Sequence, residues 1–129
     1  MLFLNSDLKL PSPGTAVEDL RQRVRGFIAE EIHACRFAPI CNSWTEGFSA
    51  EFSRRLGAKG WIGYHWPRQY GGQGGSAFDT LTINEELLAA GAPVGAHWVA
   101  ARQSAPLLMR FGSEAQRQEF LPHIAAGEL

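Results

Sequence analysis

The sequence contains little cysteine, carries almost no net charge and has no apolar run as long as a membrane span. Cys35 and Cys41 are its two cysteines, and because their spacing fits no zinc motif we expect a reduced, cytoplasmic chain. A formal net charge of -1 favours neither nucleic acid nor an anionic membrane as a partner. The first residues also lack the basic start and apolar core of a signal peptide.

The bulk composition predicts one globular domain. Hydrophobic residues make up 45% of the 129 positions and charged residues 19%, which is ordinary for a folded protein and argues against disorder. Residues 1–14 are broken by Pro11, Pro13 and Gly14, so we expect them to form an irregular lead-in. Residues 15–129 then form the domain.

The segment Gly60–Ser76, GWIGYHWPRQYGGQGGS, combines many glycines with large aromatic side chains. Its glycines and Pro67 exclude a continuous helix. Trp61 and Trp66 bring a large apolar area that needs packing partners. We therefore predict an ordered crossover in which both tryptophans are buried.

Gly72, Gly74 and Ala77 match the dinucleotide-binding pattern G-x-G-x-x-[G/A]. That pattern binds phosphate only between a strand and a helix, where the helix N-terminus faces the pyrophosphate. Here residues 65–70 precede it, with a proline and no apolar run for a central strand. The segment therefore favours a structural crossover that ends in a helix cap.

Amphipathic patterns on both sides of the crossover predict five helices and no sheet, so the fold class is all-α. Helices are expected to begin near Thr15, Ser43, Ser76, Pro93 and Ser113. Four of these starts read as capping boxes: Thr15–Glu18, Ser43–Glu46, Ser76–Asp79 and Ser113–Gln116.

Three details of these helices can be predicted. In the second helix Trp44, Phe48, Phe52 and Leu56 recur every four residues and should form one buried stripe. Apolar residues surround much of the third helix, which should be largely buried. The fourth helix runs to Phe111 and should be kinked or split by Pro106, which cannot donate a backbone hydrogen bond.

Two groups of polar residues have side chains suited to a metal site or to acid–base catalysis, but their spacing in the sequence does not fit either role. His33, Cys35, Cys41 and His65 show no paired metal-ligand spacing, so they favour structural or surface roles. Neighbouring residues on a helix point about 100° apart, so Glu85 and Glu86 do not form a carboxylate pair for acid–base chemistry.

The fourth helix carries the candidate binding residues. Trp98 and Arg102 share one face, as do Val99 and Gln103, in a segment otherwise rich in Ala, Val and Leu. If buried, Arg102 and Gln103 need partners, because unpaired buried polar groups are costly. They either pair with the crossover or a neighbouring chain, or line a pocket for a ligand with polar groups.

Several motifs, in order and at matching spacing over about residues 56–128, resemble the N-terminal helical domain of the acyl-CoA dehydrogenases. The run Ala92–Trp98 with Arg102 and Gln103 is most similar to actinobacterial members that act on bulky, including steroid-derived, acyl-CoAs. The motifs are Gly60-Trp61, Trp66-Pro67, Tyr70-Gly71-Gly72, Glu85-Glu86-Leu87, Phe111-Gly112 and Phe120-Leu121-Pro122.

The resemblance implies a bacterial, FAD-dependent enzyme that oxidises an acyl-CoA thioester to the trans-2-enoyl-CoA. It implies acyl-CoA as substrate, an electron-transfer flavoprotein-type acceptor, and a homo- or hetero-oligomer. In this family the helical domain packs against a central β domain and a C-terminal helical domain, which carry the flavin contacts and the catalytic glutamate. Those domains would lie beyond Leu129, so no catalytic or cofactor-binding residue is assigned. The expected substrate-binding residues are Trp98, Val99, Arg102 and Gln103.

Two hypotheses follow from the resemblance. The chain is the N-terminal part of a dehydrogenase, inactive alone and unable to bind FAD alone, or it is a free-standing helical module that binds a protein partner. Under the first hypothesis Leu87, Leu88, Trp98 and Leu108 cannot all enter one small core, so the isolated chain should associate or be poorly soluble. The codons after Leu129 would separate the two hypotheses.

Overall fold

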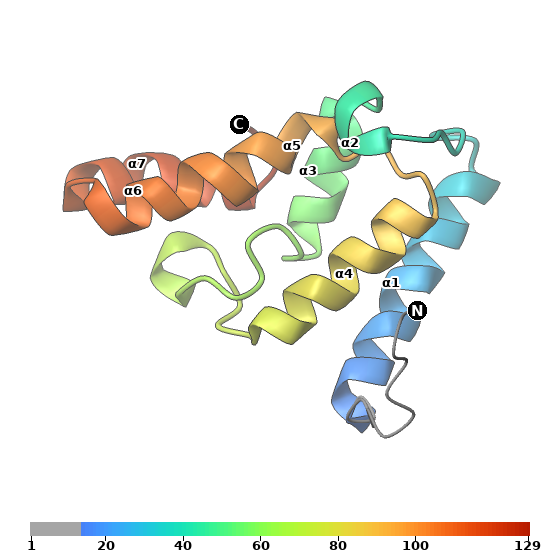
Figure 1. Ribbon diagram of the computed structural model, residues 1–129, viewed down its shortest axis with the longest axis horizontal. Coiled ribbons are helices and arrows are strands. Elements are labelled where there is room, and N and C mark those ends of the chain that lie inside the picture. The colour runs from blue at the N-terminus through green and yellow to red at the C-terminus, as the bar shows by residue number, and fades with distance from the viewer. Residues whose placement is uncertain (1–13) are drawn as a thin grey trace, which may run out of the picture.

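The computed structural model describes residues 14–129, so the predicted lead-in lies outside the described residues except for Gly14. Figure 1 shows two helical arms joined through the centre of the molecule: α1 beside α4, and α6 beside α7. The elements are α1 (Thr15–His33), α2 (Ser43–Glu46), α3 (Ala50–Ala58), the 3-10 turn η1 (Arg68–Tyr70), α4 (Ala77–Ala89), α5 (Gly95–Val99), the π-helical segment η2 (Ala100–Ser104), α6 (Ala105–Phe111) and α7 (Glu114–Ala125).

The all-α prediction is confirmed: no strand forms in residues 14–129, where one isolated bridge pairs Phe48 with Val94. The core is built from the inner faces of α1, α3, α4 and α7 together with the crossover. Within the same residues, no helix combines the length and hydrophobicity that crossing a membrane requires.

Two of the four predicted capping boxes form. Ser76 accepts from the backbone N–H of Asp79 at the start of α4, and Ser113 accepts from that of Gln116 at the start of α7. The helix begins at Thr15 as predicted, but the Thr15 box is wrong because Thr15 is the first helical residue and not the N-cap. Gly14 is the N-cap, its carbonyl accepts from Val17 N–H at 3.0 Å, and no side chain caps the helix.

The predicted second helix is in fact two, α2 and α3, and its box at Ser43 is also wrong. Gly47 breaks the helix because its backbone lies against Pro93, leaving no room for a side chain, and its carbonyl accepts from Gly95 N–H at 2.8 Å. Ser49 caps α3 instead, accepting from Phe52 N–H at 3.1 Å.

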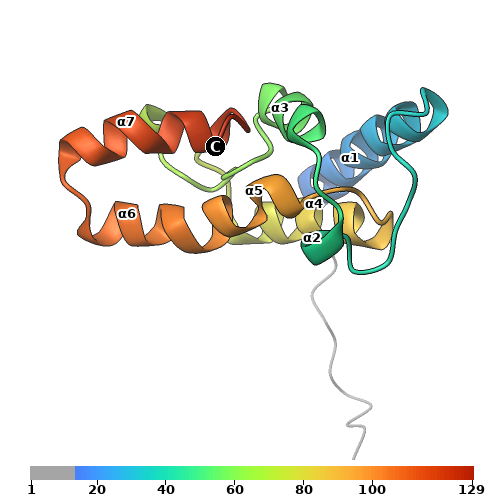
Figure 2. The same cartoon turned by 90° about the horizontal axis from the view of Figure 1, so that it is seen from above.

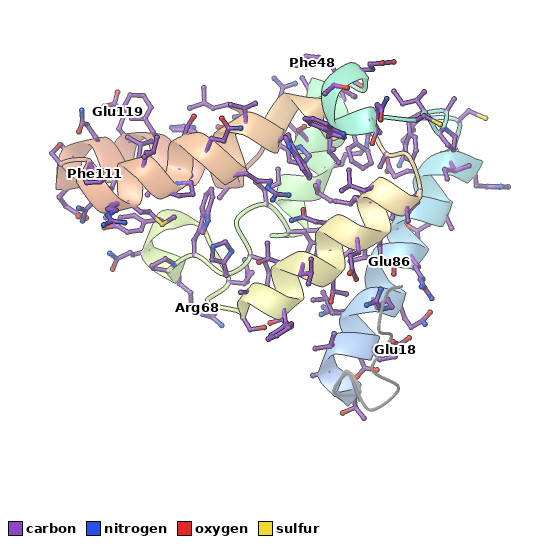
Figure 3. The ribbon with its side chains drawn as sticks, in the orientation of Figure 1. Glu18, Phe48, Arg68, Glu86, Phe111 and Glu119 are labelled. Carbon is purple, nitrogen blue, oxygen red and sulfur yellow. The ribbon has the colours of Figure 1, made fainter. Side chains whose placement is uncertain are left out.

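This break divides the predicted buried stripe of the second helix. Phe52 and Leu56 on α3 are in the core, whereas Trp44 is 49% exposed and Phe48 is 76% exposed. The four-residue spacing was correct for α3 and did not continue across Gly47. Figure 3 shows Phe48 at the outer edge of the molecule, beside α2.

The crossover is ordered, and the prediction that its tryptophans are buried is confirmed. Trp61 is 7% exposed and Trp66 1%. The segment folds back on itself: Gln73 N–H and Gly75 N–H both donate to the Tyr64 carbonyl, and Gly74 N–H donates to that of Trp66. The Trp61 ring meets Phe27 of α1 edge to face, with ring centroids 5.4 Å apart.

The third predicted helix, α4, is buried on one side only, so the prediction that it is largely buried is wrong. Thr82, Ile83, Glu86 and Leu87 are covered. Leu81 is 51% exposed, because the opposite side of α4 has no helix packed directly on it.

The predicted kink at Pro106 takes the form of a π-helical segment, η2, which ends at Ser104, two residues before the proline. Pro106 has no N–H to donate to the carbonyl of Arg102, so the regular hydrogen-bond ladder is interrupted there. In Figure 2, α5, η2 and α6 nevertheless form one long helical rod that runs antiparallel to α7.

The four apolar residues named in the association prediction differ in burial. On α4, Leu87 lies in the core and is 1% exposed, whereas Leu88 is 37% exposed. On the rod, Trp98 and Leu108 are partly buried. Association of the isolated chain stays a prediction. The most exposed apolar side chains of the rod are Val99, Leu107 and Phe111.

Candidate functional site

A groove of about 440 Å³ lies between α4, the α5–α6 rod and the crossover. Its position follows from the fold, because α4 uses its other side to pack on α1. The walls are mainly apolar, with hydrogen-bonding side chains at intervals. The apolar lining includes Leu56, Trp61, Ile62, Leu87, Leu88 and Ala101, and the polar lining is His65, Thr80, Asn84, Glu85, His97 and Arg102.

Two of the four predicted binding residues line this groove. Trp98 and Arg102 both face it, and the Arg102 guanidinium lies 4.4 Å from the centre of the Trp98 ring. Arg102 is exposed, so its guanidinium remains solvated while it makes a cation–π contact with the Trp98 ring.

The other two predicted residues do not line the groove. Val99 is 54% exposed and Gln103 is exposed, both on a neighbouring face of the rod. The helical spacing therefore paired the residues correctly, but only the face of Trp98 and Arg102 lines the groove. The premise that Arg102 and Gln103 are buried is wrong.

A buried serine–histidine pair at the base of the groove was not predicted from the sequence. His97 of α5 lines the groove and is 5% exposed, and its Nδ1 lies 2.7 Å from Ser53 Oγ of α3. Burial lowers the pKa of His97 to about 4, so the ring is neutral at pH 7. His97 stands beside Trp98 in a segment otherwise rich in Ala and Val, and this contrast is the sequence signal that could identify it.

The side of α4 facing α1 is held by a carboxylate between two guanidiniums. Glu86 accepts from Arg25 Nε at 2.7 Å and also from Arg21 Nη1. The hydrogen bond from Arg25 is the main cause that lowers the pKa of Glu86, with Arg21 adding to it. Figure 3 shows Glu86 on this side of α4, away from the groove.

The adjacent carboxylate, Glu85, is exposed at the rim of the groove and accepts from Arg21 Nη2 at 3.3 Å. The two neighbouring glutamates therefore share the Arg21 guanidinium, and they differ in exposure, because Glu86 is covered and Glu85 is not. Neither is placed as an acid–base partner of the other. At the same rim, His65 Nδ1 lies 3.0 Å from Thr80 Oγ1.

The glycine run of the crossover does not fit a flavin or phosphate cradle. A side chain on Gly72 would lie 2.2 Å from the Trp66 carbonyl oxygen, and one on Gly75 would lie 2.3 Å from the Tyr64 ring. The space that these glycines leave is therefore filled by the crossover itself. No strand precedes the run in the described chain, although a dinucleotide-binding turn requires one.

The four His and Cys residues considered for a metal site are not gathered together. Over residues 14–129 no three His, Cys, Asp or Glu side chains lie close enough to hold one ion jointly. Cys35 and Cys41 are exposed free thiols.

The all-α fold with its aromatic crossover agrees with the family that the sequence matches. Residues 15–128 match the family model "Acyl-CoA dehydrogenase, N-terminal domain", and the chain belongs to the acyl-CoA dehydrogenase family.

Three related proteins support this assignment. The chain is 35% identical over 116 residues to acyl-CoA dehydrogenase FadE26 of Mycobacterium tuberculosis, covering 87% of this chain and 28% of that protein. It superposes on the ChsE4-ChsE5 complex from Mycobacterium tuberculosis with a TM-score of 0.72 at 33% identity, covering 94% of this chain and 30% of the other. It also superposes on the Tcur3481-Tcur3483 steroid ACAD with a TM-score of 0.73 at 30% identity, covering 95% and 31%.

The chain thus spans less than a third of the length of each of these relatives. Both solved structures are named as pairs of different proteins.

Proposed function

We propose that this chain acts as the N-terminal helical domain of an FAD-dependent acyl-CoA dehydrogenase and forms one wall of the acyl pocket. The observation that carries the proposal is the largely apolar groove between α4 and the α5–α6 rod, in a chain of this family. Apolar walls with a few hydrogen-bonding groups are typical of sites for small, mostly hydrocarbon ligands.

The rest of the enzyme is supplied from outside these residues. No group within the groove is placed as a base, because Glu85 is exposed beside Arg21 and His97 is hydrogen-bonded to Ser53. The flavin of the family and the proton-abstracting carboxylate therefore come from other domains or chains. The chain's own contribution is to bind and orient the acyl group and to exclude water from it.

A bulky acyl group is the substrate class we favour. One similar structure is named as a steroid ACAD, and the groove has a volume of about 440 Å³. A hetero-oligomer fits the same proposal, because the similar structures are named as pairs of different proteins.

Filling the groove tests the proposal. Ala101 lines the groove and is half-buried, so Ala101→Phe places a ring where the acyl group would lie. Overpacking of this kind should weaken binding of a steroid acyl-CoA about 10-fold or more. Isothermal titration calorimetry on the 129-residue chain measures the affinity.

Gln103→Phe is the matched control, because Gln103 lies two residues further along the same rod, is exposed and does not line the groove. Its affinity should stay within about 2-fold of the parent chain, as for a substitution at an exposed position. Equal affinities for the two variants would contradict the placement of the acyl group.

A further inference from the structure

The base of the groove holds a histidine of which the protein uses only one ring nitrogen. His97 Nδ1 makes the contact with Ser53, and this is the ring's only hydrogen bond within residues 14–129. The His97 Nε2 atom therefore has no hydrogen-bond partner in these residues. It is also not fully covered, because the one fully covered side-chain N or O atom without a partner in this part of the chain is Trp66 Nε1. His97 lines the groove, so Nε2 keeps contact with the groove.

The contact with Ser53 sets the position of the ring proton. Ser53 is 2% exposed, and His97 Nδ1 is the acceptor within reach of its hydroxyl group. A buried hydroxyl donates its hydrogen whenever an acceptor is available. The tautomer that satisfies the Ser53 hydroxyl has Ser53 donating to Nδ1, and it places the proton of the neutral ring on Nε2.

We propose that His97 Nε2–H donates a hydrogen bond to a keto or hydroxyl oxygen carried by the acyl group, which makes His97 a specificity-determining residue for oxygenated acyl-CoAs. This inference rests on the proposed function of the groove. The acceptor is not the thioester carbonyl, because that carbonyl lies beside the reacting carbons and the catalytic groups outside this chain. Leu56 and Ile62 line the same groove as His97, so apolar side chains share the space with this donor.

The chemistry of the site selects an uncharged oxygen. A hydrocarbon placed over His97 leaves a buried N–H without a partner, which costs binding energy. A carboxylate is disfavoured as well, because the neutral ring gives it no opposite charge to offset its desolvation. A ketone or an alcohol satisfies the donor without that cost.

The test compares two probes: a steroid acyl-CoA with a ketone on the ring farthest from the thioester, and the same molecule with that ketone replaced by methylene. Binding to the full 129-residue chain is followed by calorimetry and by long-range hydrogen–nitrogen spectra of ¹⁵N-labelled histidine. The free chain should show His97 protonated on Nε2. The ketone probe should shift this signal and bind about 5–10-fold more tightly than the methylene probe.

Substitutions separate a specific hydrogen bond from a structural role. His97→Phe should abolish the preference for the ketone probe, and His97→Gln, which keeps an N–H donor, should retain part of it. His33→Phe is the matched control, because His33 is exposed at the end of α1 and does not line the groove. The spectra of the unsubstituted chain give the result even if His97→Phe fails to fold.

The outcomes distinguish the two proposals. Equal binding of both probes with no movement of the His97 signal overturns this inference and leaves the proposed function standing. An equal shift with both probes also overturns it, because it assigns the hydrogen bond to the thioester or to water. Binding of neither probe by this chain overturns the inference, whereas the proposed function, in which other domains complete the pocket, is tested separately by turnover in a complete enzyme.

Discussion

Replacement of Trp66 by alanine is expected to lower the free energy of unfolding by about 3–5 kcal/mol, as for a large aromatic side chain removed from a core. Trp66 is 1% exposed and is the largest fully buried side chain of the described residues. Its neighbours cannot close the cavity easily. Gly63 and Gly72 lie directly against it, and a side chain on Gly63 would be 2.3 Å from its ring. Urea unfolding followed by circular dichroism measures the loss.

Two further variants make this test specific. Phe78→Ala is the control, since Phe78 is 71% exposed, and its effect should be within about 0.5 kcal/mol. Trp66→Phe should cost less than Trp66→Ala, because it keeps most of the apolar ring and removes the Nε1–H that has no partner. If Trp66→Ala is no more destabilising than Phe78→Ala, the crossover is not part of the core.

A second large effect is expected on acidification. The pKa of His97 is lowered by burial from 6.5 to about 4 in the folded chain. Between these two values only the unfolded chain takes up a proton at this residue, so protonation favours unfolding. The stabilisation is fully present above pH 6.5 and is lost as the pH falls toward 4. At about 1.4 kcal/mol per pH unit, the loss between pH 6.5 and pH 4.5 is roughly 2–3 kcal/mol.

The measurement is urea unfolding at several pH values between 7 and 4.5 for the parent chain and for His97→Phe. The phenylalanine variant cannot take up this proton, so its free energy of unfolding should fall less steeply over that range. The difference in slope between the two chains isolates His97 from the other titrating groups. Parallel curves would show that His97 is not buried as a neutral ring.

The parts of the fold that depend on neighbouring residues could be predicted from the sequence. Ser76 and Ser113 cap their helices by contacts three residues away, and the aromatic residues of the crossover need burial wherever they lie. Pro106 disturbs its own helix through its missing N–H. The caps and the proline act within about one helical turn, and the burial of the aromatic residues follows from their large apolar area.

The predictions that the structure contradicts concern places where segments far apart in the sequence come into contact. The predicted helix from Ser43 is broken by Gly47, whose backbone packs on Pro93, and no local pattern shows that contact. The binding residues show the same limit: the sequence placed Trp98 and Arg102 on one face, but which face borders the groove depends on α4 and the crossover. The contact between Ser53 and His97 joins residues 44 positions apart, which no periodicity indicates.

Residues 15–128 are expected to serve as the N-terminal domain of an acyl-CoA dehydrogenase. The most direct test is a chimera in which they replace the corresponding domain of FadE26 of Mycobacterium tuberculosis, a relative that is 35% identical over 116 residues. The measurement is the conversion of an acyl-CoA that the parent FadE26 oxidises to the product lacking two hydrogens, followed by mass spectrometry with an artificial electron acceptor. We expect turnover by the chimera and its loss in the chimera carrying Ala101→Phe but not in that carrying Gln103→Phe. A chimera that folds and retains its flavin but gives no product, or one indifferent to Ala101→Phe, would contradict this expectation.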